Sequence, residues 1–219
     1  IKATDEDHPD RVHILTAAGA VLGEVASHAD NVEILHEALH VYREAIRIAP
    51  DGSHEQGVAL INLTSTCRDG NDRLDAPHLI EEGIDAGEKA LAIFPGPGLH
   101  RAAALTALSN TLRDRSRMTG SLSDLDHALQ HAQEALELTP PGHSEYAARL
   151  TNLAVLLSDD YEERANVAAL DEAIALYRDA VSATERVGSR VTERLNDLAL
   201  ALRDRHKNSA NADDGHCSS

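Results

Sequence analysis

Apolar residues return along this chain at a constant interval of 45 residues. The clearest column contains Leu15, Leu60, Leu105, Leu150 and Leu195. Three further columns keep the same interval: Ala45, Ala90, Ala135 and Ala180; Leu35, Ile80, Leu125 and Leu170; Leu39, Ile84, Leu129 and Ile174. Independent columns in one register over four periods indicate an array of four and a half repeats.

Within each repeat the apolar spacing is that of an amphipathic helix. Leu150, Leu153, Ala154 and Leu157 stand at i, i+3, i+4 and i+7, and a second stripe follows from Leu170. Each repeat is therefore predicted to contain a helix A, a loop and a helix B. Helix B has a start signal at one repeat position, which holds Asn31, Ala76 (followed by Pro77), Ser121 and Asn166. The turns between repeats contain Pro50, Pro95 and Pro140.

Neither helix can bury its apolar stripe alone, so neighbouring repeats must stack. The predicted fold is all-α, a right-handed α-solenoid of helix-turn-helix repeats. We expect one repeat domain over residues 1–207, with repeats at about 8–52, 53–97, 98–142 and 143–187 and a half repeat at 188–207. Residues 208–219 form a polar tail, which we expect to be disordered.

Composition supports this fold and narrows the function. Aromatic residues make up 2% of the chain, which disfavours an all-β fold. The formal charge of −17 opposes binding to nucleic acid or to an anionic membrane. Two cysteines form no disulfide framework, and no apolar run reaches the ~18 residues of a membrane span, so we expect a cytoplasmic protein. The chain begins at Ile1, and its numbering is compatible with a start inside a longer protein.

The order of the columns resembles the tetratricopeptide repeat. Ala38, Tyr42, Ala45 and Pro50 have the spacing of its second helix, and residues 15–22 have that of its first helix with Leu in place of Trp and Tyr. The period of 45 residues exceeds the usual length of about 34. This longer form, with His-Pro-Asp-Arg at 8–11 and Asp-Leu-Asp at 124–126, is similar to arrays of large actinobacterial and fungal proteins. Those arrays often adjoin a caspase-like CHAT peptidase domain or a nucleotide-binding switch, and the resemblance implies an adaptor role.

Repeat two departs from the pattern of its neighbours. Gly83 and Gly87 stand where other repeats have Ala or Tyr, and Cys67 stands in a Leu column. Because each Gly costs ~1 kcal/mol relative to Ala in a helix, we expect this to be the least stable helix pair.

Two motifs suggest chemistry. His36, Glu37 and His40 form a literal H-E-x-x-H, the zinc-ligand and general-base pattern of metallopeptidases, but no third ligand motif follows. An exposed helix face is the preferred interpretation, and the same holds for the His127 and His131 pair. Cys67 falls in a core column and Cys217 in the tail, so neither is predicted to be a catalytic nucleophile. No cofactor is expected.

The concave face, which helix A mainly lines in arrays of this kind, is the candidate binding groove. Asn62 and Asn152 share the column that holds a peptide backbone in tetratricopeptide repeats, and Asn110 or Arg113 would replace the intervening Ala107. Arginines there would favour an acidic or C-terminal carboxylate group, although each is followed by Asp and could instead form an ion pair between repeats. The full candidate set is Asn62, Arg68, Thr106, Asn110, Arg113, Thr151, Asn152, Asn196 and Arg203.

The sequence thus favours a non-catalytic scaffold that binds a protein or peptide segment on the concave helix-A face. A first alternative is a regulatory array from a multidomain CHAT-type peptidase or signalling protein, packed on its own neighbouring domain. A remote alternative is a zinc metalloenzyme that uses His36, Glu37 and His40.

Overall fold

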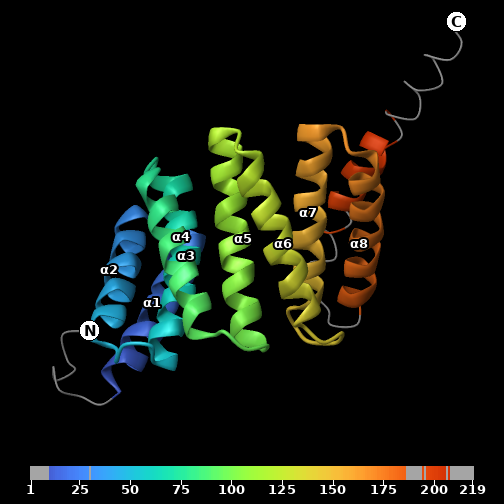
Figure 1. Cartoon of the computed structure of the whole chain (residues 1–219). Helices are drawn as coiled ribbons and strands as arrows, with labels where there is room; N and C mark the ends of the chain where they lie inside the picture. Colours follow the sequence, from blue (N-terminus) through green and yellow to red (C-terminus); the bar gives the residue numbers. More distant parts are fainter. Residues whose placement is uncertain (1–9, 30, 186–193, 195, 206, 208–219) are drawn as a thin grey trace, which may run out of the picture. The chain divides into compact units, whose positions relative to one another are not determined.

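A computed structural model describes residues 10–29, 31–185, 194, 196–205 and 207, and over these residues it is helical with no strand (Figure 1). The named helices are α1 (Arg11–Ala29), α2 (Val32–Ile48), α3 (His54–Leu74), α4 (His78–Ile93), α5 (Leu99–Thr119), α6 (Leu122–Glu137), α7 (Tyr146–Arg164) and α8 (Val167–Glu185). Odd-numbered helices are the predicted A helices and even-numbered ones the B helices. The predicted all-α array of helix pairs is confirmed. The chain divides into two compact units, Ile1–His131 and Ala132–Ser219, and one domain over 1–207 stays a prediction.

The helix starts follow the predicted capping residues with one correction. The Asn31 side chain accepts hydrogen bonds from the backbone N–H groups of Glu33 (3.0 Å) and Ile34 (3.2 Å) at the start of α2. The hydroxyl of Ser121 and the amide oxygen of Asn166 accept equivalent bonds at the starts of α6 and α8. At the second repeat α4 begins after Pro77 without a side-chain cap, one residue later than predicted. An alanine at position 76 offers no acceptor, so the fixed φ of proline alone marks this start.

The repeat columns form the core, as predicted. Leu15, Leu60, Leu105 and Leu150 are at most 4% exposed. The alanine column from Ala45 to Ala180 is also buried, and so is the column that begins at Leu35. Leu129 is half-buried, and Leu195 lies outside the described residues.

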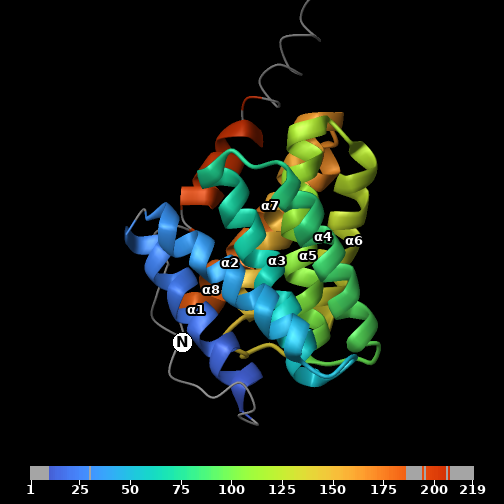
Figure 2. The ribbon, with the colours of Figure 1, turned by 90° about the vertical axis from the view of Figure 1, so that its left-hand side faces the viewer.

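In the first unit α3 and α5 each pack on the preceding B helix. Ala59 of α3 belongs to one cluster with Val41 and Ala45 of α2. Ala104 of α5 occupies the same repeat position and clusters with Ala86 and Ala90 of α4. Small side chains at this position let the helix axes approach closely. The A helices also contact each other, α1 with α3 and α3 with α5. Figure 2 views this unit with α1 and α2 nearest the reader.

The second unit packs α7 against α8. Its core includes Ala154, Leu170 and Tyr177, and the helical residues 196–205 add Ala201. This helix is held to α8 by an ion pair in which Arg205 Nε lies 2.5 Å from Asp171 Oδ1. The remainder of the predicted half repeat, apart from residues 194 and 207, lies outside the described residues, and so does the predicted tail at 208–219.

Arg149 of the second unit is a charged residue in a buried repeat position. It takes the repeat position that Ala59 and Ala104 hold in the first unit, and it is 5% exposed. Its guanidinium donates a hydrogen bond to the hydroxyl of Thr139. Burial lowers the pKa of Arg149, because desolvation disfavours its charged form.

Among the described residues, no helix combines the length and apolar character that crossing a bilayer requires.

Candidate docking surface on the A helices

Two predicted asparagines lie on neighbouring A helices of the first unit. Asn62 follows the buried Leu60 by two residues, which places it about 200° around α3, away from that part of the core. Asn110 lies on α5, and both asparagines are half-buried. Within the described part of the chain, neither side-chain amide has a hydrogen-bond partner. Each amide therefore has a donor and an acceptor available for a ligand.

The predicted threonines have less capacity for hydrogen bonds to a ligand than the two asparagines. The Thr106 hydroxyl donates to the carbonyl of Ala102 at 2.8 Å, one turn earlier in α5. In the second unit the Thr151 hydroxyl donates to Ala147 (3.0 Å) and accepts from Arg194 Nε (3.1 Å). Since their only protons are used inside the protein, these two residues retain acceptor capacity alone.

Arg68 is engaged with acidic side chains. Its Nη2 lies 3.1 Å from Asp69 Oδ1, and its Nε lies 3.9 Å from Asp114 Oδ2 on α5. Burial raises the pKa of Asp114, and the positive charge of Arg68 opposes that rise. Arg113, next to Asp114 on α5, is half-buried. The ion pair between repeats, which the sequence left open as an alternative, is therefore present at Arg68.

The remaining candidates belong to the second unit. Asn152 lies half-buried on α7 and already has an interaction within the protein. Asn196 and Arg203 are exposed on the helix at 196–205, and Arg203 Nε donates to Asp204 at 3.0 Å. Joint action of Asn62 and Asn152, which lie in different units, stays a prediction.

The H-E-x-x-H motif lies on an exposed helix face. His36, Glu37 and His40 are exposed on α2, whereas Ala38 and Leu39 between them are buried. Across the described ranges, no group of three or more His, Cys, Asp or Glu side chains is placed to hold a metal ion. The alternation of exposed and buried residues along this part of α2 is that of an amphipathic helix.

Cys67 has the buried position that its column predicts. It is 0% exposed, and burial raises the pKa of its thiol to about 12. Because the thiolate is the reactive form of cysteine, this side chain acts as a small apolar core residue. Cys217 lies outside the described residues.

The chain shares its fold with several solved structures over almost its whole length. A Podospora anserina protein described as a putative kinesin light chain, with nearly identical TPR-like repeats, matches with a TM-score of 0.63 and 12% identity, over 94% of this chain and 92% of that chain. BtubC (BKLC) from P. vanneervenii matches with a TM-score of 0.57 and 17% identity, over 95% and 89%. No protein-family model and no curated protein matches the sequence. At these identities the likeness concerns the fold, which is that of TPR-like repeats.

One surface feature was missed by reasoning from the sequence. A hollow in the first unit is lined by residues that include Gln56, Lys89 and Ala92, none of them a predicted site residue. The repeat register contains a signal for it. At the position of Ala92, the other repeats have the larger Arg47 and Glu137, or Ser182.

Proposed function

We propose that the A-helix surface of the first unit, α1, α3 and α5, docks an extended segment of a partner protein and that the chain carries out no catalysis. The observation that carries this proposal is a pair of amides, Asn62 on α3 and Asn110 on α5, whose side chains have no hydrogen-bond partner among the described residues. The two helices contact each other and are linked by the ion pair of Arg68 with Asp114. A segment that crosses both helices meets one amide on each.

An amide side chain suits an extended peptide backbone. It can donate to a carbonyl and accept from an N–H group, so it binds main chain with little dependence on sequence. Half-burial supports this role, because a partly desolvated hydrogen bond competes less with water. Arg68 contributes little net charge, since Asp69 and Asp114 already surround its guanidinium. Affinity should therefore depend on short-range contacts and only weakly on salt.

The fold supports an interaction scaffold in general. Stacked repeats present a continuous row of like helices, and such rows provide extended binding surfaces. The partner is a segment of another protein or of an adjacent domain in the same polypeptide. A neighbouring CHAT-type domain is one source from which that segment could come.

The test uses peptides selected from a random dodecamer library displayed on phage. Binding of a selected peptide is then measured by calorimetric titration for the wild type and for the Asn62→Ala/Asn110→Ala double variant. Each lost hydrogen bond should cost about 1 kcal/mol, so the double variant should bind roughly thirtyfold more weakly. Gln130→Ala, which removes an exposed amide from α6, is the matched control and should bind as the wild type does.

Equal affinities for the wild type and the double variant, with unchanged melting temperatures, would move the docking surface off the A helices. Loss of binding in the Gln130→Ala control would point to the B helices instead.

A further inference from the structure

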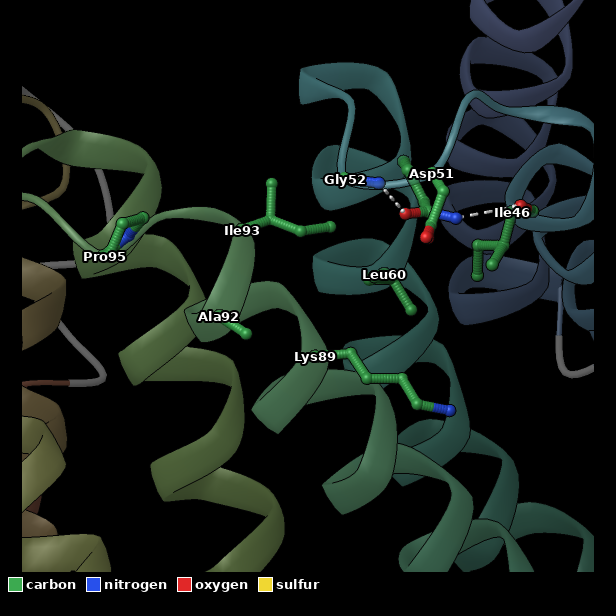
Figure 3. A pocket seen from close by; sticks show the side chains of 9 residues that line it. Ile46, Asp51, Gly52, Leu60, Lys89, Ala92, Ile93 and Pro95 are labelled. Carbon is green, nitrogen blue, oxygen red and sulfur yellow. Dashed lines mark hydrogen bonds between the residues drawn. The ribbon is translucent and has the colours of Figure 1, made fainter.

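A hollow of about 650 Å³ lies in the first unit where the first two repeats meet. Its lining comes from the end of α2, the turn that follows, the start of α3 and the end of α4 (Figure 3). Gln56 and Leu60 of α3, about 40° apart around the helix, face it. Asn62 is about 200° from Leu60, so the hollow lies on the opposite side of α3 from the proposed docking surface. Its volume falls in the range of small-ligand and side-chain pockets.

The rim of the hollow is held in place by hydrogen bonds. The Gln56 amide oxygen accepts from the Gly52 N–H at 2.9 Å, and its nitrogen donates to the Ile46 carbonyl at 3.4 Å (Figure 3). One side chain thus fastens the turn between repeats to the end of α2. Ala92 leaves space that a longer side chain at this position would fill. The hollow is therefore a feature of the folded state rather than of a loop that must close.

The hollow has aliphatic walls and an acidic residue at its rim. Ile46, Leu60 and Ile93 provide aliphatic walls. The ammonium group of Lys89 lies 2.7 Å from Asp85 Oδ2, so its charge is already paired. Asp51 is exposed and has no ion-pair partner among the described residues. The unpaired charge at the rim is thus negative, in a chain with a net charge of −17.

We propose that this hollow, here called the junction hollow, binds a second segment of a partner protein, one that carries a branched aliphatic side chain beside a basic residue. The aliphatic group enters between Ile46, Leu60 and Ile93, and the cation pairs with Asp51. The exposed rim at Asp51, Gly52 and Pro95 favours a group that projects from a larger molecule over an enclosed small ligand. An acidic segment is rejected, because it would meet the negative charge of Asp51 while Lys89, the basic residue of the lining, is paired with Asp85.

The experiment uses three capped hexapeptides with the central pairs Leu-Arg, Leu-Glu and Ala-Arg between Gly and Ser residues. Each is titrated into the ¹⁵N-labelled chain while the amide signals of Gly52 and Ile93 are followed by NMR. The Leu-Arg peptide should shift both signals. It should bind about fivefold more tightly than Leu-Glu, from one exposed charge pair, and about tenfold more tightly than Ala-Arg, from the buried aliphatic group.

Matched variants separate the contributions of the aliphatic group and of the charge pair to the binding of the peptides. Ala92→Trp should fill the hollow and abolish the shifts, whereas Ala20→Trp on the exposed face of α1 should not. If Ala92→Trp disturbs folding, Ala92→Arg serves, since the first repeat has Arg47 at this position. Asp51→Asn should remove the preference for Arg over Glu but keep that for Leu over Ala. Glu37→Gln, an exposed acid on α2, is its control.

The proposal is overturned if none of the peptides shifts the Gly52 and Ile93 signals, if all three bind equally, or if the filled hollow still binds. The Asn62→Ala/Asn110→Ala variant should retain Leu-Arg binding. Failure of this site and failure of the A-helix surface are therefore distinguishable.

Discussion

The first two helix pairs fill the same space in opposite ways. In α1–α2 the ring of Tyr42 lies over Gly19, and a Cβ added to Gly19 would be 2.7 Å from Tyr42 Cε1. In α3–α4 the corresponding positions hold Gly87 and Thr64. There the neighbouring repeat takes up the space, since a Cβ on Gly87 would be 3.1 Å from Leu108 Cδ1 on α5. The space beside a glycine can thus be filled either by an aromatic residue of the same repeat, such as Tyr42, or by a side chain of the next repeat, such as Leu108.

The glycines of repeat two are therefore packing positions as well as residues of low helix propensity. Helix propensity alone predicts that Gly83 and Gly87 weaken α4. Both are contact sites, however, and a Cβ on Gly83 would lie 3.2–3.3 Å from Cys67, Thr111 and the Thr64 carbonyl. Close packing offsets part of the propensity loss. That repeat two is the least stable pair stays a prediction, and variants of Tyr42, Gly87 and Cys67 test it.

The largest effect is expected for Tyr42→Ala in the first pair. Tyr42 is 3% exposed, and its removal leaves a cavity above Gly19 that the helix backbone cannot close. The free energy of unfolding should fall by about 3–5 kcal/mol. Urea denaturation followed by circular dichroism measures it, with Tyr42→Phe as the control that keeps the ring. A loss below 1 kcal/mol for Tyr42→Ala would show that the first pair does not depend on its aromatic residue.

A smaller effect, about 1–3 kcal/mol of destabilisation, is expected for Gly87→Ala in the second pair. The added methyl group forces the buried Leu108 to move, and this overpacking exceeds the gain of ~1 kcal/mol in helix propensity. Gly23→Ala is the matched control, because nothing lies within 4 Å of its Cβ position on α1. The control should stabilise the protein by roughly 0.5–1 kcal/mol. If both variants stabilise it equally in thermal unfolding, close packing at Gly87 is excluded.

The smallest effect is an alkaline instability that Cys67 contributes to the second pair. Burial raises the pKa of its thiol from 9.0 to about 12, so above pH 9 the unfolded chain releases a proton that the folded chain retains. Stability is therefore lost as the pH rises from 9 towards 12. Between pH 7 and 10 the wild type should lose about 1–1.5 kcal/mol more than Cys67→Ala, measured by urea denaturation at each pH.

The first pair should show its own alkaline effect at higher pH. Burial raises the pKa of Tyr42 from 10.0 to about 12, so its contribution begins above pH 10 and should disappear in Tyr42→Phe. If the free energy of unfolding depends on pH in the same way in the wild type, Cys67→Ala and Tyr42→Phe, the alkaline effects do not come from Cys67 and Tyr42.

The candidate site could be anticipated from the sequence only in part. The register placed Asn62 and Asn110 on A helices, because each residue's distance from a core column fixes its direction on a helix. The register could not show that the Asn62 amide has no partner within the described ranges, or that Arg68 reaches Asp114 on another helix. Such contacts depend on the rotamers of long side chains and on the distance between helices.

The positions of the helices and the residues of the core could be predicted from the sequence alone. A period of 45 residues, helical apolar spacing, N-caps such as Asn31 and turns at Pro50, Pro95 and Pro140 are local or periodic signals, and each fixes backbone conformation or burial within one repeat. The way volumes are shared between helices, as at Tyr42 over Gly19, became visible only in the folded chain. The same holds for the space that remains unfilled, as in the junction hollow beside Ala92. Close packing is settled jointly by side chains from several helices, whereas periodicity records only which side of a helix is buried.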